Sequence, residues 1–128
     1  MKTRNCLALL AALCLVIISP GLSFAHGNHK AMHGGIVKAM GETVIELVVA
    51  ADGARIYLRD EAEGTPLAAS GGKLVALREG ARAEASLVPD AGGYLAAKGV
   101  KLVTGTRVSV QIVLADGQTR VAANFAIP

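Results

Sequence analysis

The three histidines of the chain, His26, His29 and His33, fall within one short stretch, with Met32 between the last two and Met40 shortly after. Imidazole nitrogen binds Zn²⁺, Cu²⁺ and Ni²⁺, and thioether sulfur is a soft ligand that suits Cu⁺. These side chains therefore have the donor types of a transition-metal site, and the sequence predicts that they bind copper or zinc. Met40 also fits a core or rim position.

The residues before this stretch have the layout of a secretory signal peptide. Lys2 and Arg4 precede an apolar run over residues 7–18, and small residues follow up to Ala25. The run is shorter than the ~20 apolar residues that a membrane-spanning helix needs. We therefore expect cleavage after Ala25, which removes the segment 1–25. The mature protein would be periplasmic or secreted, would begin at the first histidine and would have no membrane span.

Cleavage at this point would add one more metal donor. The α-amine and the imidazole of His26 can chelate one ion together, and His29 or His33 would complete a brace. In this one feature the chain resembles periplasmic copper carriers and copper oxygenases that have an N-terminal His brace. An oxygenase needs a platform for its substrate, and this chain is only 3% aromatic and has no Trp. A copper carrier is the better interpretation.

The histidines are expected to lie on a flexible arm formed by residues 26–34. Gly27, Asn28 and Gly34 disfavour a helix there, and a flexible arm lets its donors converge on one ion. Two plainer alternatives stay open. A histidine-bearing arm can be a solvated tail without any ligand, and the string His33-Gly34-Gly35 can be only the turn that leads into the first strand.

Other catalytic chemistry finds no support in the sequence. Cys6 and Cys14 both lie in the segment that is removed, so the mature protein would have no disulfide and no thiolate ligand. The serines do not form a Gly-x-Ser-x-Gly elbow, and no glycine pattern of the phosphate-binding type is present. Glu46 and Glu84 are assigned to solvated strand faces. The sequence therefore predicts a protein that is not an enzyme.

The charge balance implies no polyanionic partner. The formal net charge of the whole chain is +3. Removing two of the 13 basic residues with the signal peptide leaves eleven against 10 acidic ones. Such a nearly neutral protein is not expected to bind nucleic acid. The acidic stretch over residues 60–72 is expected to be a solvated loop, because nothing in it fixes the geometry of a metal site.

Apolar residues alternate with polar ones along most of the remaining chain, which is the period of a β-strand. Asp52-Gly53 and Asp116-Gly117 favour hairpin turns of type I′, which require positive φ at both central residues. The sequence therefore predicts one all-β domain over residues 35–128, an antiparallel β-sandwich of seven to eight short strands of the Ig-like or Greek-key type. The expected strands are 35–39, 43–49, 55–59, 73–78, 83–88, 94–97, 108–114 and 120–127.

Five short strings carry a resemblance to a known family. They are His33-Gly34-Gly35-Ile36-Val37, Glu46-Leu47-Val48-Val49, Ile56-Tyr57-Leu58-Arg59-Asp60, Gly64-Thr65-Pro66-Leu67 and Leu114-Ala115-Asp116-Gly117. In these strings the chain resembles a small periplasmic β domain of heavy-metal resistance systems. That domain occurs as a free-standing exported protein, or near the N-terminus of the periplasmic adaptor subunits of heavy-metal efflux pumps of the resistance-nodulation-division class.

The resemblance implies a non-catalytic role in handling copper, zinc or a related ion in the periplasm, with transfer to a heavy-metal efflux complex or another envelope protein. The position that matches a ligand is His33. The chain lacks the helical hairpin and lipoyl-like module of full adaptors, so it would not itself bridge a pump to an outer-membrane channel. The alternative function is a metal-independent β-sandwich module for protein interaction in the cell envelope.

Overall fold

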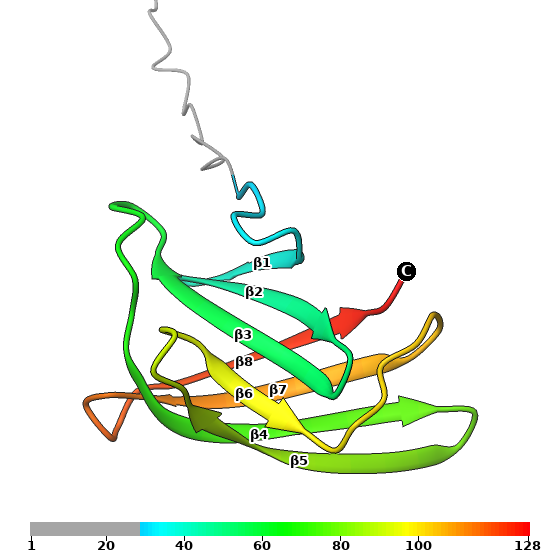
Figure 1. Cartoon of the computed structure of the whole chain (residues 1–128). Helices are drawn as coiled ribbons and strands as arrows, with labels where there is room; N and C mark the ends of the chain where they lie inside the picture. The colour runs from blue at the N-terminus through cyan, green and yellow to red at the C-terminus, as the bar shows by residue number, and fades with distance from the viewer. Residues whose placement is uncertain (1–28) are drawn as a thin grey trace, which may run out of the picture.

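The computed structural model describes residues 29–128, and these residues form eight β-strands and no helix. The predicted signal peptide and His26 lie outside the described residues. Among the described residues, no helix has the length and hydropathy needed to cross a membrane. The strands, shown in Figure 1, are β1 (Ile36–Met40), β2 (Thr43–Ala50), β3 (Gly53–Asp60), β4 (Ala69–Arg78), β5 (Ala81–Pro89), β6 (Leu95–Lys98), β7 (Arg107–Leu114) and β8 (Arg120–Ala126).

The strands form where the sequence alternates, because one face of each strand packs on the core. In β7, Val108, Val110 and Ile112 are buried, whereas Arg107 and Gln111 are exposed. All the segments expected from this pattern are strands, and their ends differ from the expected ones by a few residues. The period of two therefore predicts the elements of this fold correctly.

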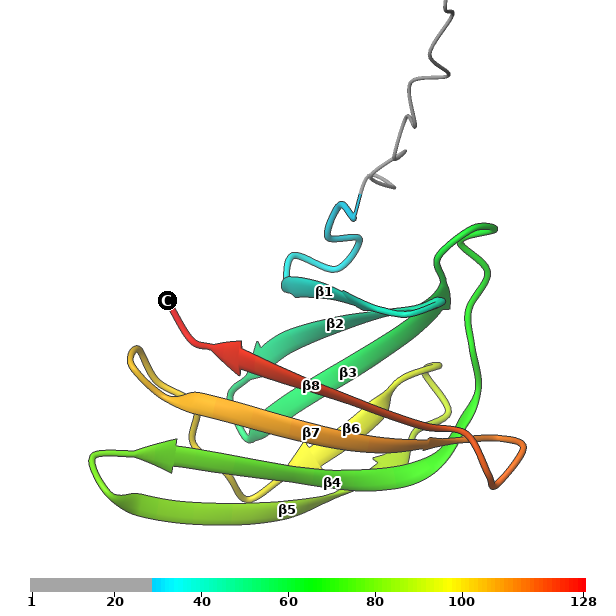
Figure 2. The same ribbon diagram turned by 180° about the vertical axis from the view of Figure 1, so that it is seen from behind.

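The strands pair in the order β1-β2-β3-β6-β5-β4-β7-β8, and every pair is antiparallel. The two ends of this order, β1 and β8, lie side by side (Figures 1 and 2). The ammonium group of Lys38 on β1 lies 5.8 Å from the ring centre of Phe125 on β8. The sheet is therefore nearly closed on itself.

The prediction of an all-β antiparallel fold is confirmed, and its finer arrangement is barrel-like rather than clearly that of an Ig-like sandwich. The reason lies in β5. This strand pairs with β4 from Ala81 to Leu87 and then reaches β6 through Val88 and Pro89. It thereby joins two halves of the molecule, one formed by β1, β2, β3 and β6 and the other by β4, β7 and β8. The result is one curved sheet around one core.

The two turns expected to be of type I′, at Asp52-Gly53 and Asp116-Gly117, do not have this geometry, because neither aspartate has positive φ. The type I′ pattern occurs between β4 and β5, where Glu79 and Gly80 have φ of 48° and 78°. At the Asp52-Gly53 pair the turn is made one residue earlier, and Gly53 already pairs with Ala50 as the first residue of β3. A side chain at Gly53 would collide with the backbone carbonyl of Ala97 on β6, so this glycine serves strand packing.

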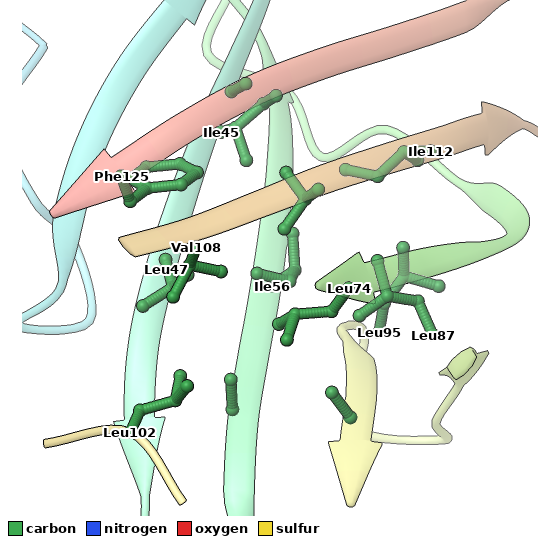
Figure 3. Close-up of a cluster of buried hydrophobic side chains, with 14 of the residues drawn as sticks. Ile45, Leu47, Ile56, Leu74, Leu87, Leu95, Leu102, Val108, Ile112 and Phe125 are labelled. Carbon is green, nitrogen blue, oxygen red and sulfur yellow. The ribbon is translucent and has the colours of Figure 1, made fainter. Parts of the chain in front are cut away.

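One hydrophobic core fills the space between the two halves of the sheet, as Figure 3 shows. Its largest fully buried aliphatic side chains come from β2, β3, β4 and β7, so both halves contribute. The core occupies the inner face of every strand, and the outer face of β2 and β3 is left for other contacts. The labelled core residues in Figure 3 are Ile45, Leu47, Ile56, Leu74, Leu87, Leu95, Leu102, Val108, Ile112 and Phe125.

Candidate metal-binding site

A buried carboxylate lies on the outer face of β2. Since Ile45 and Leu47 point into the core, Glu46 between them points outward, as the alternation predicts. Its side chain is nevertheless 0% exposed. The prediction of a solvated carboxylate at this position is therefore wrong, because the segment before β1 folds back over the outer face and covers it.

The Glu46 carboxylate holds this segment by four hydrogen bonds. Its Oε1 accepts the backbone N–H groups of His33 at 2.8 Å and of Gly35 at 2.9 Å. Its Oε2 accepts the backbone N–H of Met32 at 3.0 Å and pairs with the ring Nδ1 of His33 at 3.1 Å. Bonds to an ionised acceptor are stronger than bonds between neutral groups. The sequence predicts a flexible arm as far as residue 34, whereas the structure ties its last part to the sheet.

Arg59 on β3 fastens the same segment at a second point. Its Nη2 donates to the backbone carbonyl of Lys30 at 2.8 Å, and its Nη1 lies 3.7 Å from Oε2 of Glu46. The Arg59 side chain is only 14% exposed, so its positive charge acts close to the buried carboxylate. The guanidinium therefore compensates the negative charge of Glu46. It also anchors Lys30, which comes just before the residues that the Glu46 carboxylate holds.

Burial raises the pKa of a carboxyl group and is the largest single influence on Glu46. The hydrogen bonds from Gly35, from the backbone and ring of His33 and from Met32 together outweigh it, and they hold the pKa of Glu46 below its ordinary value of 4.5. Because the pKa is lower in the folded protein, these bonds stabilise the fold fully above pH 4.5. This stabilisation is lost as the pH falls through the lowered pKa.

The ring of His33 is held in one orientation. It stacks on the ring of Tyr57 with 3.5 Å between ring centres and 6° between planes. Tyr57 lies in turn 5.4 Å from Tyr94, over whose ring the Arg55 guanidinium carbon lies at 5.0 Å. An ionised carboxylate can only accept a hydrogen bond, so Nδ1 of His33 must carry the proton that it donates to Glu46. The lone pair of the neutral ring is then on Nε2, and the side chain is 43% exposed.

The other expected ligands differ in how close they lie to His33. Met32 is its direct neighbour and is 69% exposed. His29 is four residues upstream of His33, with its Nε2 3.4 Å from Oε1 of Glu61. Met40 pairs with Thr43 at the far end of β1, about 10 Å along the strand from the position opposite Glu46. The structure therefore does not bring Met40 to the other donors.

Among the described residues, no group of three or more His, Cys, Asp or Glu side chains is arranged to hold a metal ion. A complete site at His33 would need donors from Met32, from His29 after it leaves Glu61, or from residues upstream of 29. The acidic loop between β3 and β4 contributes only the contact of Glu61 with His29. What the structure shows directly is one oriented and accessible imidazole.

Sequence reasoning missed the residues that support His33, which are Glu46, Arg59 and Tyr57. One signal could have revealed Glu46. Its neighbours on the same face of β2, Val44 and Val48, are apolar, so this strand is apolar on both faces. A strand of that kind is covered on both faces, and a carboxylate in it needs partners.

Comparisons of the chain with family models, with curated proteins and with solved structures found no match. The fold and the site therefore define the class of this protein only as a barrel-like all-β domain that carries a docked histidine on its outer face.

The contact of residues 32–35 with the outer face of β2 predicts the effect of a methyl group at Gly35. A Cβ there would meet the backbone carbonyl of Leu47 and lie 2.9 Å from Cγ2 of Val48. Gly35→Ala is expected to destabilise the protein by about 1–3 kcal/mol and to expose the amide of His33, because the segment must move away from Glu46. Urea unfolding and hydrogen exchange measure the two effects.

The neighbouring glycine gives the matched control. A Cβ on Gly34 meets nothing within 4 Å, although its φ is +75°. Gly34→Ala should therefore cost only backbone strain of about 1–2 kcal/mol and leave the amide of His33 protected. Equal loss of protection in both variants would contradict the docking described above.

Proposed function

We propose that this protein binds copper or zinc in the periplasm after export and handles the ion without catalysing a reaction. The observation that carries the proposal is the pairing of His33 with the buried carboxylate of Glu46. Metal-binding histidines commonly donate their second ring N–H to a carboxylate, which fixes the tautomer and makes the free nitrogen a better ligand. His33 has this partner and also has a stacked ring that sets its plane.

The remaining donors would come from the same end of the chain. Met32 offers a thioether next to His33, and His29 offers a second imidazole. If export cleaves the chain after Ala25, the α-amine and imidazole of His26 add a chelating pair. Imidazole and amine nitrogens suit Cu²⁺ and Zn²⁺, whereas the thioether favours Cu⁺.

A site of this kind suits capture and transfer of an ion. The imidazole of His33 is held by the sheet but is open to solvent, so a partner can approach the bound metal. The resemblance to the periplasmic β domain of heavy-metal resistance systems supports the same role, with delivery to an efflux complex or another envelope protein as its purpose.

Metal titration of the exported protein tests this proposal. Calorimetry with Cu²⁺ and with Zn²⁺ should show a tight site, and His33→Ala should weaken it at least severalfold because the oriented ligand is lost. Blocking the N-terminal amine should weaken it as well. Asn124→Ala, an exposed change on β8, serves as the control and should leave the affinity unchanged.

The opposite result has a clear meaning. If neither His33→Ala nor a blocked amine changes the affinity for either ion, the proposal is wrong. Imidazole ligands bind metal only when deprotonated, so the affinity should also fall as the solution is made acidic. An affinity independent of pH between 5 and 8 would count equally against it.

A further inference from the structure

One strand of the sheet has an edge that no other strand covers. On one side β5 pairs with β4 from Ala81, opposite Arg78, to Leu87, opposite Gly72. On its other side it pairs with β6 only at Val88 and Pro89. Within residues 29–128, the second edge of β5 over residues 81–87 therefore has no strand partner. In both views β5 forms the lower margin of the molecule (Figures 1 and 2).

This edge is long enough to receive another strand. Residues 81–87 contain no proline, and Ala81, Ala83 and Ala85 place only methyl groups on one face. A free edge of this kind exposes a row of unpaired backbone N–H and C=O groups. Natural proteins often protect such edges with charges of one sign, which repel a second copy. Here the two charged residues, Arg82 and Glu84, have opposite signs and stand two positions apart.

That spacing is self-complementary. When a strand pairs with its own copy in the antiparallel direction and the centre is Ala83, Arg82 of each copy lies opposite Glu84 of the other. A centre at either charged residue would place it opposite itself. We propose that two copies of this chain associate through β5, antiparallel and centred on Ala83, with two reciprocal Arg82–Glu84 pairs.

The charges needed for these pairs are already in place. Within one copy, Arg82 Nη2 lies 2.5 Å from Oε1 of Glu84, and Lys73 Nζ lies 2.9 Å from its Oε2. The three side chains are 41–57% exposed, so they are free to exchange partners. In the dimer, Arg82 pairs with Glu84 of the second copy, and Lys73 remains paired with Glu84 of its own chain. The alanines of the two copies then meet on the other face of the joined sheet.

The arrangement leaves the candidate metal site open. The segment before β1 lies at the opposite end of the molecule from β5 in both views (Figures 1 and 2). The dimer would form one continuous sheet from β8 of one copy to β8 of the other, with a His33 at each outer end. The inference stands on β5 alone and does not depend on metal binding.

Charge reversal separates contacts between copies from contacts within one copy. We expect sedimentation equilibrium of the full exported protein to show a dimer at micromolar concentration. Arg82→Glu and Glu84→Arg should each weaken it about tenfold or more, because like charges then face each other. A mixture of the two variants should form a heterodimer of near wild-type affinity, because each variant supplies the charges that the other lacks.

Arg120→Glu on β8, which reverses a charge away from β5, should leave the dimer unchanged. The inference is overturned if the wild-type protein is monomeric up to 100-fold above the micromolar range, or if the mixed variants do not associate. Should a charge variant fail to fold, hydrogen exchange of the wild-type protein decides: the amides of residues 81–87 that point away from β4 must be better protected at high than at low protein concentration.

Discussion

Exchanging Glu46 for glutamine is expected to weaken copper or zinc binding about 10- to 100-fold, the usual effect of removing the outer partner of a metal-binding histidine. Glutamine has the size of glutamate but presents an NH₂ group to at least one of the N–H donors that Glu46 now accepts. The ring of His33 loses the ionised acceptor for its Nδ1–H, so the bond that fixes its tautomer and orientation is weakened. Calorimetric titration of Glu46→Gln beside the wild type measures the loss.

Glu42→Gln provides the matched control, because Glu42 is an exposed glutamate in the turn before the same strand. It should leave the affinity unchanged. A second readout follows from the lowered pKa of Glu46. The stability of the wild-type protein should include a component that is lost as the pH falls below 4.5, and Glu46→Gln should lack it. Identical metal affinities for Glu46→Gln and the wild type would remove Glu46 from the site.

Truncation of the core behind this site is expected to have the largest effect on stability. Ile56 on β3 is 0% exposed and packs in the core (Figure 3). Because successive side chains of a strand point to opposite faces, its neighbour Tyr57 lies on the outer face. Ile56→Ala should lower the free energy of unfolding by about 2–5 kcal/mol, because it removes buried methyl groups and leaves a cavity. Urea denaturation followed by circular dichroism measures this change.

Val49→Ala gives the comparison, since Val49 is also on a strand but is 43% exposed. It should cost less than about 0.5 kcal/mol. If the two variants lose similar stability, Ile56 is not at the centre of a packed core and the barrel-like arrangement is incorrect.

The elements of this fold follow from the sequence, but their closure into a barrel does not. Alternation in β2 and β7 shows which side chains face the core, because the period of a strand is local. The period does not say which strands become neighbours. The pairing of β6 with β3 brings Lys98 to Gly53 and Leu95 to Ile56, which are contacts between distant parts of the chain that no local pattern encodes.

The candidate site likewise combines a residue that can be identified from the sequence with residues that cannot. His33 can be selected from the sequence because its residue type and the clustering of histidines indicate metal chemistry. The role of Glu46 cannot, because alternation shows only that it points outward. The cover over it comes from a segment more than ten residues away, through hydrogen bonds to backbone groups that every residue possesses. Side-chain types alone do not predict such contacts.

The stacking of His33 on Tyr57 has a consequence for the thermodynamics of the proposed metal capture. A mobile side chain loses rotational freedom when it becomes a ligand, at a cost of about 0.5–1.5 kcal/mol. Here that freedom is given up when the domain folds, so the imidazole is preorganised before any ion arrives. The metal affinity of His33 should therefore depend on the rigidity of the outer face of β3. A substitution that loosens the stacking of His33 on Tyr57 should weaken metal binding even though it removes no ligand.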